Sequence, residues 1–235
     1  MALAQAAHHA RHRTVFQKKL SDQPMMRMLI ADMALEMEGV TALMMRLCRS
    51  FDQAVSDSGE AARARLLTPA VKYWVCKSAP PFIYEAMECL GGNGYVEELP
   101  LSRLYREAPV NAIWEGSGNV MCLDVLRALA REGDAARAVL SDLVHACGDL
   151  PGAKAAAAFI AGTLVAADGE ARARAAVERL AMLAAAAALA EGAPGDIAAA
   201  FARTRLAGSR GGTFGTADLD GAEVTMLSER ALPAA

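Results

Sequence analysis

The sequence predicts an all-α protein, and two features of composition and one of patterning carry that prediction. Apolar residues make up 54% of the 235-residue chain and charged residues 22%, which is enough apolar side chain for a packed core. Aromatic residues are only 5%, and alanine, leucine and methionine take their place, whereas strands favour β-branched and aromatic side chains. Apolar positions also recur at steps of three and four, the period of a helix with one buried face.

Charge, cysteine usage and hydropathy narrow the class of protein. The formal net charge of −3 gives no basic field of the kind that general nucleic-acid binding needs. The five cysteines contain no CxxC pair, which indicates small buried thiols in a reducing compartment rather than a disulfide framework or a metal site. No apolar run reaches the length of a membrane span, and no signal-peptide pattern is present. We therefore expect a cytoplasmic protein without a membrane partner or a metal.

Two helices are predicted in the first fifty residues. Residues 2–19 have the composition of a helix interior, although no capping residue precedes them. Asp22 and Pro24 are a cap and a first-turn proline, and the helix they begin is predicted to reach about Phe51. Its apolar stripe is expected to be core filler and consists of Met25, Leu29, Met33, Met37, Val40, Met44 and Leu47.

A third long helix is predicted over about residues 60–90. Pro69 and the pair Pro80-Pro81 are expected to kink or interrupt it. Gly91-Gly92 ends it, because glycine accepts the left-handed backbone that closes a helix. A short helical turn over about 101–108, a loop and a further helix over about 117–131 complete this part of the chain.

The composition changes after Gly133, where alanine becomes dominant and aromatic residues almost disappear. Pro151, Gly169 and Pro194-Gly195 punctuate three or four more predicted helices. The chain from about Gly208 is rich in Gly, Ser and Thr, which predicts a loop or frayed tail. These changes predict one helical domain over residues 1–132 and an Ala-rich helical extension over residues 133–235.

The most informative motif pairs a glycine-rich turn with a carboxylate. Gly91-Gly92-Asn93-Gly94 is followed about two dozen residues later by Trp114-Glu115-Gly116-Ser117-Gly118-Asn119. The second run places Glu115 on a flexible loop between two helical segments, where free backbone N–H groups can meet an anionic cofactor. On its own, Glu115 is also typical of a carboxylate that interacts with the dipole of the following helix.

These motifs resemble the C-terminal helical domain of the acyl-CoA dehydrogenases, and more narrowly the AidB-type alkylation-response flavoproteins. The resemblance covers residues 1 to about 131 and is carried further by the runs at 67–70, 104–111 and 113–127. It implies an up-and-down four-helix bundle, with an extension like the AidB-type C-terminal region. Members of the family also have an N-terminal helical domain and a β-domain. We therefore expect this chain to be the C-terminal part of a longer protein, or to need a partner that supplies those domains.

The resemblance implies an FAD-dependent oxidoreductase that acts on CH–CH groups of acyl-CoA-like substrates. Glu115 stands where the family has its base, which removes the α-proton of the thioester while hydride passes to the flavin. Trp114 replaces a smaller tyrosine and is expected to narrow the acyl pocket. The isolated chain is expected to be inactive, because much of the flavin ring seat belongs to the β-domain.

Cofactor contacts are implied at three places along the chain. Arg13 and Phe16 match an Arg-x-x-Phe motif whose arginine reaches the flavin diphosphate of a neighbouring subunit and whose phenylalanine packs near the adenosine end. This match implies a homo-oligomer. The competing interpretation of Arg13 is an exposed arginine on a basic stretch with Arg11, Lys18 and Lys19.

The other two cofactor motifs depart from the family pattern. Glu88, Gly91 and Gly92 stand for Gln-x-x-Gly-Gly, so a carboxylate replaces a carboxamide and two donors are lost. After Glu115, the residues Gly116, Ser117 and Asn119 keep hydroxyl and amide chemistry with a shorter reach.

Two alternative functions stay open at this point. The first is an AidB-type DNA alkylation-response protein that binds flavin and associates with DNA, and the second is a non-catalytic helical interaction domain. After Gly133 nine Lys and Arg stand against twelve Asp and Glu, and this acidic balance argues against DNA binding. The arginines of the extension that could form cationic patches are Arg172, Arg174 and Arg179 in one group and Arg203, Arg205 and Arg210 in another.

Overall fold

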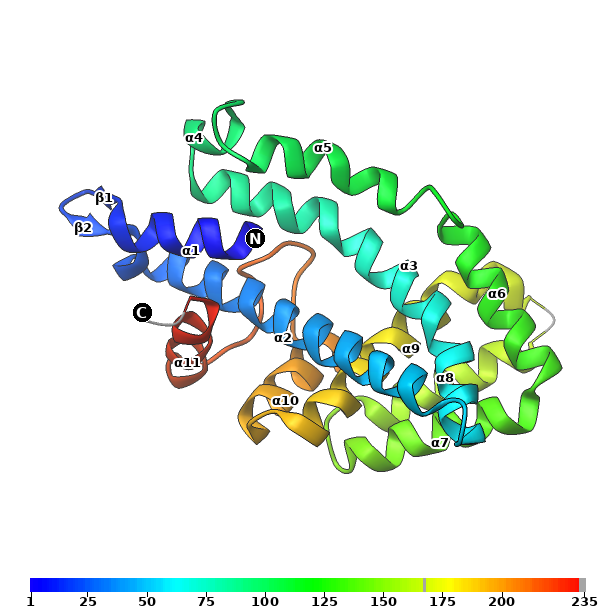
Figure 1. Cartoon of the computed structure of the whole chain (residues 1–235). Helices are drawn as coiled ribbons and strands as arrows, with labels where there is room; N and C mark the ends of the chain where they lie inside the picture. Colours follow the sequence, from blue (N-terminus) through cyan, green and yellow to red (C-terminus); the bar gives the residue numbers. More distant parts are fainter. Residues whose placement is uncertain (167, 233–235) are drawn as a thin grey trace. The chain divides into compact units, whose positions relative to one another are not determined.

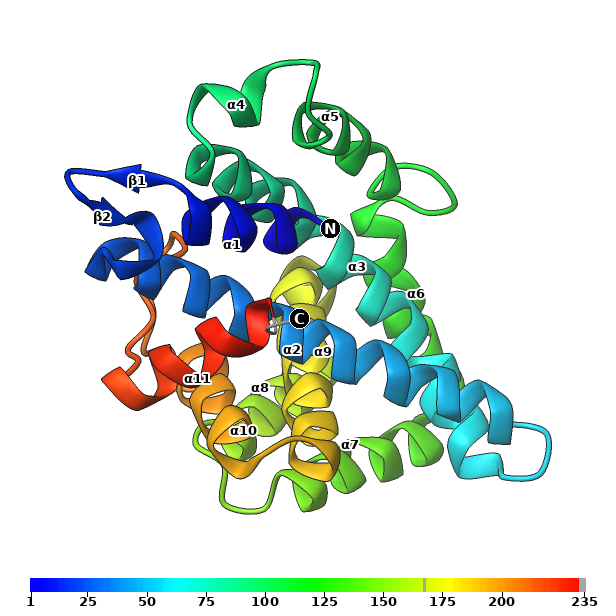
Figure 2. The ribbon, with the colours of Figure 1, turned by 60° about the vertical axis from the view of Figure 1, so that its left-hand side comes forward.

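The computed structural model describes residues 1–166 and 168–232, and these residues form eleven α-helices and one two-stranded hairpin (Figures 1 and 2). The prediction of an all-α fold is confirmed. The chain divides into two compact units: Met1–Met37, Ser78–Asn111 and Ser209–Ala235 form the first, and Glu38–Lys77 and Ala112–Gly208 form the second. None of the helices in the described residues is long and apolar enough to cross a membrane.

The first unit is built on parts of two long helices, α2 (Pro24–Gln53) and α3 (Ser58–Cys89). Its other elements are α1 (Ala2–His12), β1 (Thr14–Val15), β2 (Lys18–Lys19), a 3-10 turn (Leu20–Asp22), α4 (Gly92–Tyr95), α5 (Leu101–Asn111) and α11 (Gly221–Ala231). After the short α4 the chain turns back, and α5 runs beside the last turns of α3 (Figures 1 and 2). Met33, Phe82, Ala86 and Leu101 lie in the core of this unit.

The second unit is built around α9 (Gly169–Gly192), which is buried along most of its length. α6 (Gly118–Arg131), α7 (Gly133–Cys147), α8 (Ala153–Val165), α10 (Gly195–Phe201) and a π-helical turn (Ala202–Leu206) complete it with the remaining parts of α2 and α3. Alanine side chains on α9 leave room for α7 and α8 to approach closely, which explains why an Ala-rich segment forms a core helix. Four helices between residues 133 and 201 agree with the three or four that were predicted.

The prediction of helix over residues 13–19 is wrong. α1 ends at His12, and residues 14–19 form a hairpin that pairs Thr14 with Lys19 and Val15 with Lys18. Its two turn residues, Phe16 (φ 50°) and Gln17 (φ 65°), have left-handed backbone. Because this two-residue turn contains none of the glycines or asparagines that usually mark such turns, no hairpin could be predicted there.

The prolines of α3 were predicted to kink or interrupt it, and the prediction of an interruption is wrong. The helix continues through Pro69, Pro80 and Pro81 to Cys89. Its buried face includes Leu66 and Trp74, and tertiary packing of this kind offsets the backbone hydrogen bonds that proline removes. The predicted stripe on α2 is only partly core: Met33 and Leu47 are buried, whereas Met25 and Met44 are exposed.

The predicted loop after Gly208 contains a helix, so that expectation is also wrong. Asp220 caps α11 by accepting hydrogen bonds from the backbone N–H groups of Ala222 and Glu223. The Glu223 carboxylate accepts in turn from the backbone N–H of Asp220 at 2.9 Å, which completes a capping box. The Asp-x-x-Glu capping signal was present in the sequence, but the Gly/Ser/Thr-rich stretch before Asp220 led to the prediction of a loop.

Candidate functional site

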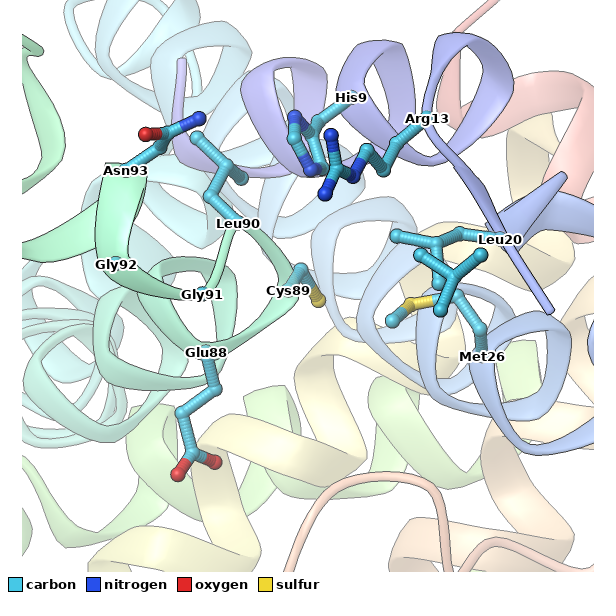
Figure 3. Close-up of a pocket in the computed structure, with 11 residues that line it drawn as sticks. His9, Arg13, Leu20, Met26, Glu88, Cys89, Leu90, Gly91, Gly92 and Asn93 are labelled. Carbon is cyan, nitrogen blue, oxygen red and sulfur yellow. The ribbon is translucent and has the colours of Figure 1, made fainter.

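The first group of predicted site residues lines one pocket of about 540 Å³ in the first unit (Figure 3). Arg13, Glu88, Gly91 and Gly92 meet there although 75 residues separate the first from the second. The other lining residues are His9, Val15, Leu20, Met26, Cys89, Leu90 and Asn93. The end of α1, the hairpin, the start of α2 and the α3–α4 corner therefore build this Arg13 pocket.

Arg13 contributes a cationic side chain to the pocket, and His9 contributes a polar imidazole. Figure 3 shows their side chains next to each other on the same side of the pocket. The Arg13 backbone is fixed at both ends: its N–H donates to the His9 carbonyl at 2.8 Å, and its carbonyl accepts from the Leu20 N–H at 2.9 Å. Burial, and then the positive charges of Arg13 and His8, lower the pKa of His9. His9 is therefore neutral near pH 7 and can donate a hydrogen bond beside a permanent cation.

The glycines shape the α3–α4 corner for two different reasons. Gly91 has φ +58°, a backbone conformation that a residue with a side chain rarely adopts. A Cβ on Gly94 would lie 2.1 Å from the Met87 carbonyl oxygen, so only glycine lets the two segments approach so closely. No heavy atom lies within 4 Å of where a Cβ would stand on Gly91 or Gly92. Their backbone is therefore open to a ligand.

The Glu88 carboxylate lies away from Arg13. Figure 3 shows it pointing to the opposite side from Arg13 and His9. Its Oε1 accepts a hydrogen bond from the Tyr84 hydroxyl at 3.1 Å, and this bond raises the pKa of Tyr84. The Glu88 carboxylate, which stands where the resemblance implies a glutamine, is thus directed away from the cationic part of the pocket.

Phe16 does not line the Arg13 pocket. It forms the tip of the hairpin, where its side chain is 89% exposed and its φ is +50°. A phenylalanine held in left-handed backbone and left exposed has no packing role in its own unit.

The second group of predicted residues lies in the second unit, on the turn over residues 112–117 that we call the Glu115 turn. Glu115 has φ +51° and is exposed, and Gly116 has φ +115°. Trp114 is 61% exposed beside them. The Lys72 ammonium, on α3, donates to the carbonyl oxygens of Trp114 at 2.6 Å and Gly116 at 2.8 Å.

The residues after the turn begin α6. Ser117 is its N-cap residue, but the Ser117 side chain makes no capping hydrogen bond. The first turn of α6 contains no acidic residue, so Glu115 lies too early in the chain to act as an ordinary helix-start carboxylate. A Cβ on Gly118 would stand 3.0 Å from Lys77 Cε and 3.4 Å from the Tyr73 ring, which explains the glycine there.

Asn119 contacts an arginine from the extension. The guanidinium of Arg174, on α9, donates from Nη1 to Asn119 Oδ1 at 3.4 Å and from Nε to the Tyr73 hydroxyl at 3.2 Å. Both bonds join residues of the second unit. The sequence indicated Arg174 only as one member of a cationic patch, and it gave no signal for Lys72, because both act through contacts with residues far away in the chain.

Several other arginines of the extension lie against residues of their own units. Arg172 and Arg179 lie over the Phe159 ring, with 5.0 Å and 3.8 Å between the guanidinium carbon and the ring centroid. Arg205 is buried. Arg210 lies 3.7 Å from the buried Asp32 carboxylate and 3.8 Å from that of Glu36. Among the described residues, no group of three or more His, Cys, Asp or Glu side chains is placed to hold a metal ion.

Comparison with known proteins gives a consistent result. The model of the family "Acyl-CoA dehydrogenase, C-terminal domain" matches residues 1–130. AidB of Escherichia coli (strain K12) is 56% identical over 131 residues, which are 56% of this chain and 24% of AidB. The chain therefore spans about a quarter of the length of that relative.

Two solved structures share the fold. Caenorhabditis elegans ACDH-11 in complex with C11-CoA aligns with a TM-score of 0.74 at 23% identity, over 100% of this chain and 41% of that one. An acyl-CoA dehydrogenase from Bacillus anthracis complexed with FAD aligns with a TM-score of 0.66 at 14% identity, over 98% of this chain and 44% of that one. These alignments confirm the acyl-CoA dehydrogenase-like helical fold and extend it through the Ala-rich region.

Proposed function

Because residues 1–130 match its C-terminal domain, this chain belongs to the acyl-CoA dehydrogenase family, and we propose that it serves an FAD-dependent oxidation of acyl-CoA-like thioesters. The observation that carries the proposal is the Arg13 pocket, where two cofactor motifs that are far apart in the sequence come together. Core packing alone does not explain why a cation and two open glycines lie in one pocket.

The Arg13 pocket fits the diphosphate of FAD. A guanidinium fork pairs well with phosphate oxygens, neutral His9 adds a donor, and the open backbone at Gly91 and Gly92 permits a close approach. Its volume of about 540 Å³ lies within the range of small-molecule sites. FAD, when bound, supplies the acceptor for the hydride that leaves the substrate.

Glu115 is the proposed base. An α-proton next to a thioester is removed by a carboxylate that can reach it, and the Glu115 side chain is exposed on its turn. Trp114 supplies an apolar wall beside it. The C11-CoA bound by ACDH-11 supports an acyl-CoA-like substrate for this chain.

The proposal includes a second polypeptide or a second copy of this chain. Phe16, exposed at the hairpin tip next to Arg13, is suited to pack against a cofactor held partly by another subunit. Homo-oligomerisation, or a partner that carries the remaining domains of the family, would complete the flavin site. Five free cysteines support a reducing, cytoplasmic location.

No observation favours DNA association as a second function. The arginines of α9 lie on aromatic rings of their own unit, and Arg210 pairs with buried carboxylates. These contacts support packing roles, whereas DNA affinity depends on cations that face phosphates.

Flavin titration of the full chain tests the cofactor proposal. The Arg13→Ala variant should bind FAD at least about tenfold more weakly than the wild type, since a charge-assisted bidentate contact is lost. Arg11→Ala is the matched control, because Arg11 donates to the Ser228 carbonyl at 3.3 Å and does not line the pocket. Equal FAD affinity for the wild type and Arg13→Ala would reject the pocket as the diphosphate site.

A further inference from the structure

The Glu115 turn is held by a side chain that is distant in the sequence. Lys72 precedes the turn by more than forty residues and lies on α3, in the same unit. Its ammonium donates to the carbonyls of Trp114 and Gly116, the residues on either side of Glu115, at 2.6 Å and 2.8 Å. Hydrogen bonds from a charged donor are shorter and stronger than neutral ones, and these distances are typical of them.

The backbone of the turn requires such support. Glu115 at φ +51° lies in a region that is unfavourable for a residue with a side chain. Such a conformation persists only where the surroundings hold it. Two carbonyls, those of Trp114 and Gly116, converge on a single ammonium, and this convergence holds the peptide plane directly before Glu115 and the plane that follows Gly116. The short segment that carries Glu115 is therefore fixed at both ends, which limits the directions open to its Cα–Cβ bond.

A second contact limits the other side of the turn. Gly116 has φ +115°, and a Cβ there would lie 2.2 Å from Met121 Cε and 3.8 Å from Lys72 Nζ. The turn is therefore packed against the first turns of α6 at the same residue whose carbonyl Lys72 binds. Lys72 and the Met121 contact hold the backbone of the turn, whereas the Glu115 side chain stays exposed.

We propose that Lys72 is the positioning residue for Glu115. It acts through the carbonyls of Trp114 and Gly116 and has no direct contact with substrate in this role. The inference rests on the proposed function of Glu115 as the base, and it adds the residue that sets the direction of that carboxylate.

Cleavage by a glutamate-specific protease, applied to the folded chain without cofactor, tests whether Lys72 holds the turn. The Lys72→Met variant, which keeps the length of the side chain and removes its donors, should raise the cleavage rate after Glu115 by about tenfold or more. Cleavage after Glu178, on α9 of the same unit, serves as the internal reference. In Lys72→Arg, cleavage after Glu115 should stay slow, because the guanidinium can also donate N–H hydrogen bonds to both carbonyls.

Lys77→Met is the matched control. Lys77 is an exposed lysine of α3, and within the described part of the chain it makes no hydrogen bond to the Glu115 turn. An unchanged rate after Glu115 in Lys72→Met would overturn the proposal. A parallel rise after Glu115 and Glu178 would also overturn it, because it would indicate general loss of stability in place of a local role.

The catalytic consequence is measured separately, as exchange of the α-proton of an acyl-CoA with solvent deuterium by the FAD-loaded protein together with the polypeptide that supplies the remaining domains of the family. Lys72→Met should lower kcat by about a hundredfold with little change in KM, since a misplaced base loses rate and not binding. A rise in KM with no change in kcat would contradict the positioning role. If the wild type shows no exchange, the proposed function fails, whereas the protease result still decides whether Lys72 holds the turn.

Discussion

At the scale of single residues, the unusual backbone conformations coincide with the predicted site. Phe16, Gln17 and Glu115 are the described non-glycine residues with positive φ, and two of the three were predicted as site residues from the sequence. Each such conformation costs on the order of 1–3 kcal/mol. The chain retains this cost at the hairpin tip next to Arg13 and at the proposed base, which is typical of positions kept for function.

Gly94 gives a prediction at this scale. Gly94→Ala should lower the free energy of unfolding by about 2–3 kcal/mol, because the new Cβ would stand 2.1 Å from the Met87 carbonyl oxygen and the backbone must shift. Gly92→Ala is the matched control, with no heavy atom within 4 Å of its Cβ position, and should cost less than about 1 kcal/mol. Urea denaturation measures both. Equal losses in the two variants would refute the close approach at Gly94.

At the scale of elements, an ion-pair cluster joins α2 and α3 within the second unit. Arg46 donates to both carboxylate oxygens of Glu60 at 2.9 Å and 2.7 Å, and the Ser50 hydroxyl donates to the same carboxylate at 2.6 Å. Glu191 of α9 pairs with Arg46 at 3.4 Å, so a helix of the extension takes part. The hydrogen bond from Arg46 lowers the pKa of Glu60 from 4.5 to about 2.

This cluster predicts acid sensitivity. The folded-state pKa of Glu60 is depressed, so its stabilisation is fully present above about pH 4.5 and is lost as pH falls through that value toward about 2. The loss should reach about 2–3 kcal/mol of unfolding free energy. Denaturant unfolding of the wild type and Glu60→Gln across this range measures it, and the variant should show a shallower dependence on pH.

The exposed pair of Glu97 with Arg106 is the control for that experiment. Both side chains are more than half exposed, and exposed pairs contribute little to stability. Glu97→Gln should therefore keep the acid dependence of the wild type. A Glu60→Gln variant with the same pH profile as the wild type would contradict the assignment.

At the scale of the whole molecule, family residues and extension residues build the second unit together. A Cβ on Gly39 would lie 2.3 Å from Phe201 Cε2, so the glycine on α2 makes room for the ring of a phenylalanine from the extension. Arg174 of the extension bonds Asn119 of the family motif. The division at residue 132 was drawn from composition and stays a prediction, and these contacts indicate that the two segments stabilise each other.

The sequence predicted most of the helices, and it missed contacts that have no local pattern. Apolar periodicity located α2 and α6 because each has one more buried face over several turns. Family-like motifs led to Arg13 and Gly91, which share a pocket. The contacts of Lys72 and Arg174 were not predicted, since their partners lie 42 or more residues away and produce no recognisable spacing in the sequence.

The central claim is that Glu115 is the base of a flavin-dependent dehydrogenation, and the most direct measurement is the loss of visible flavin absorbance when an acyl-CoA is added to the FAD-loaded protein together with the polypeptide that supplies the remaining domains of the family. The wild type should bleach, and Glu115→Gln, which keeps the shape of the side chain without its basicity, should slow bleaching by about a thousandfold or more while binding FAD equally well. Glu107→Gln, an exposed glutamate of α5, is the control and should bleach normally. Normal bleaching by Glu115→Gln would contradict the account.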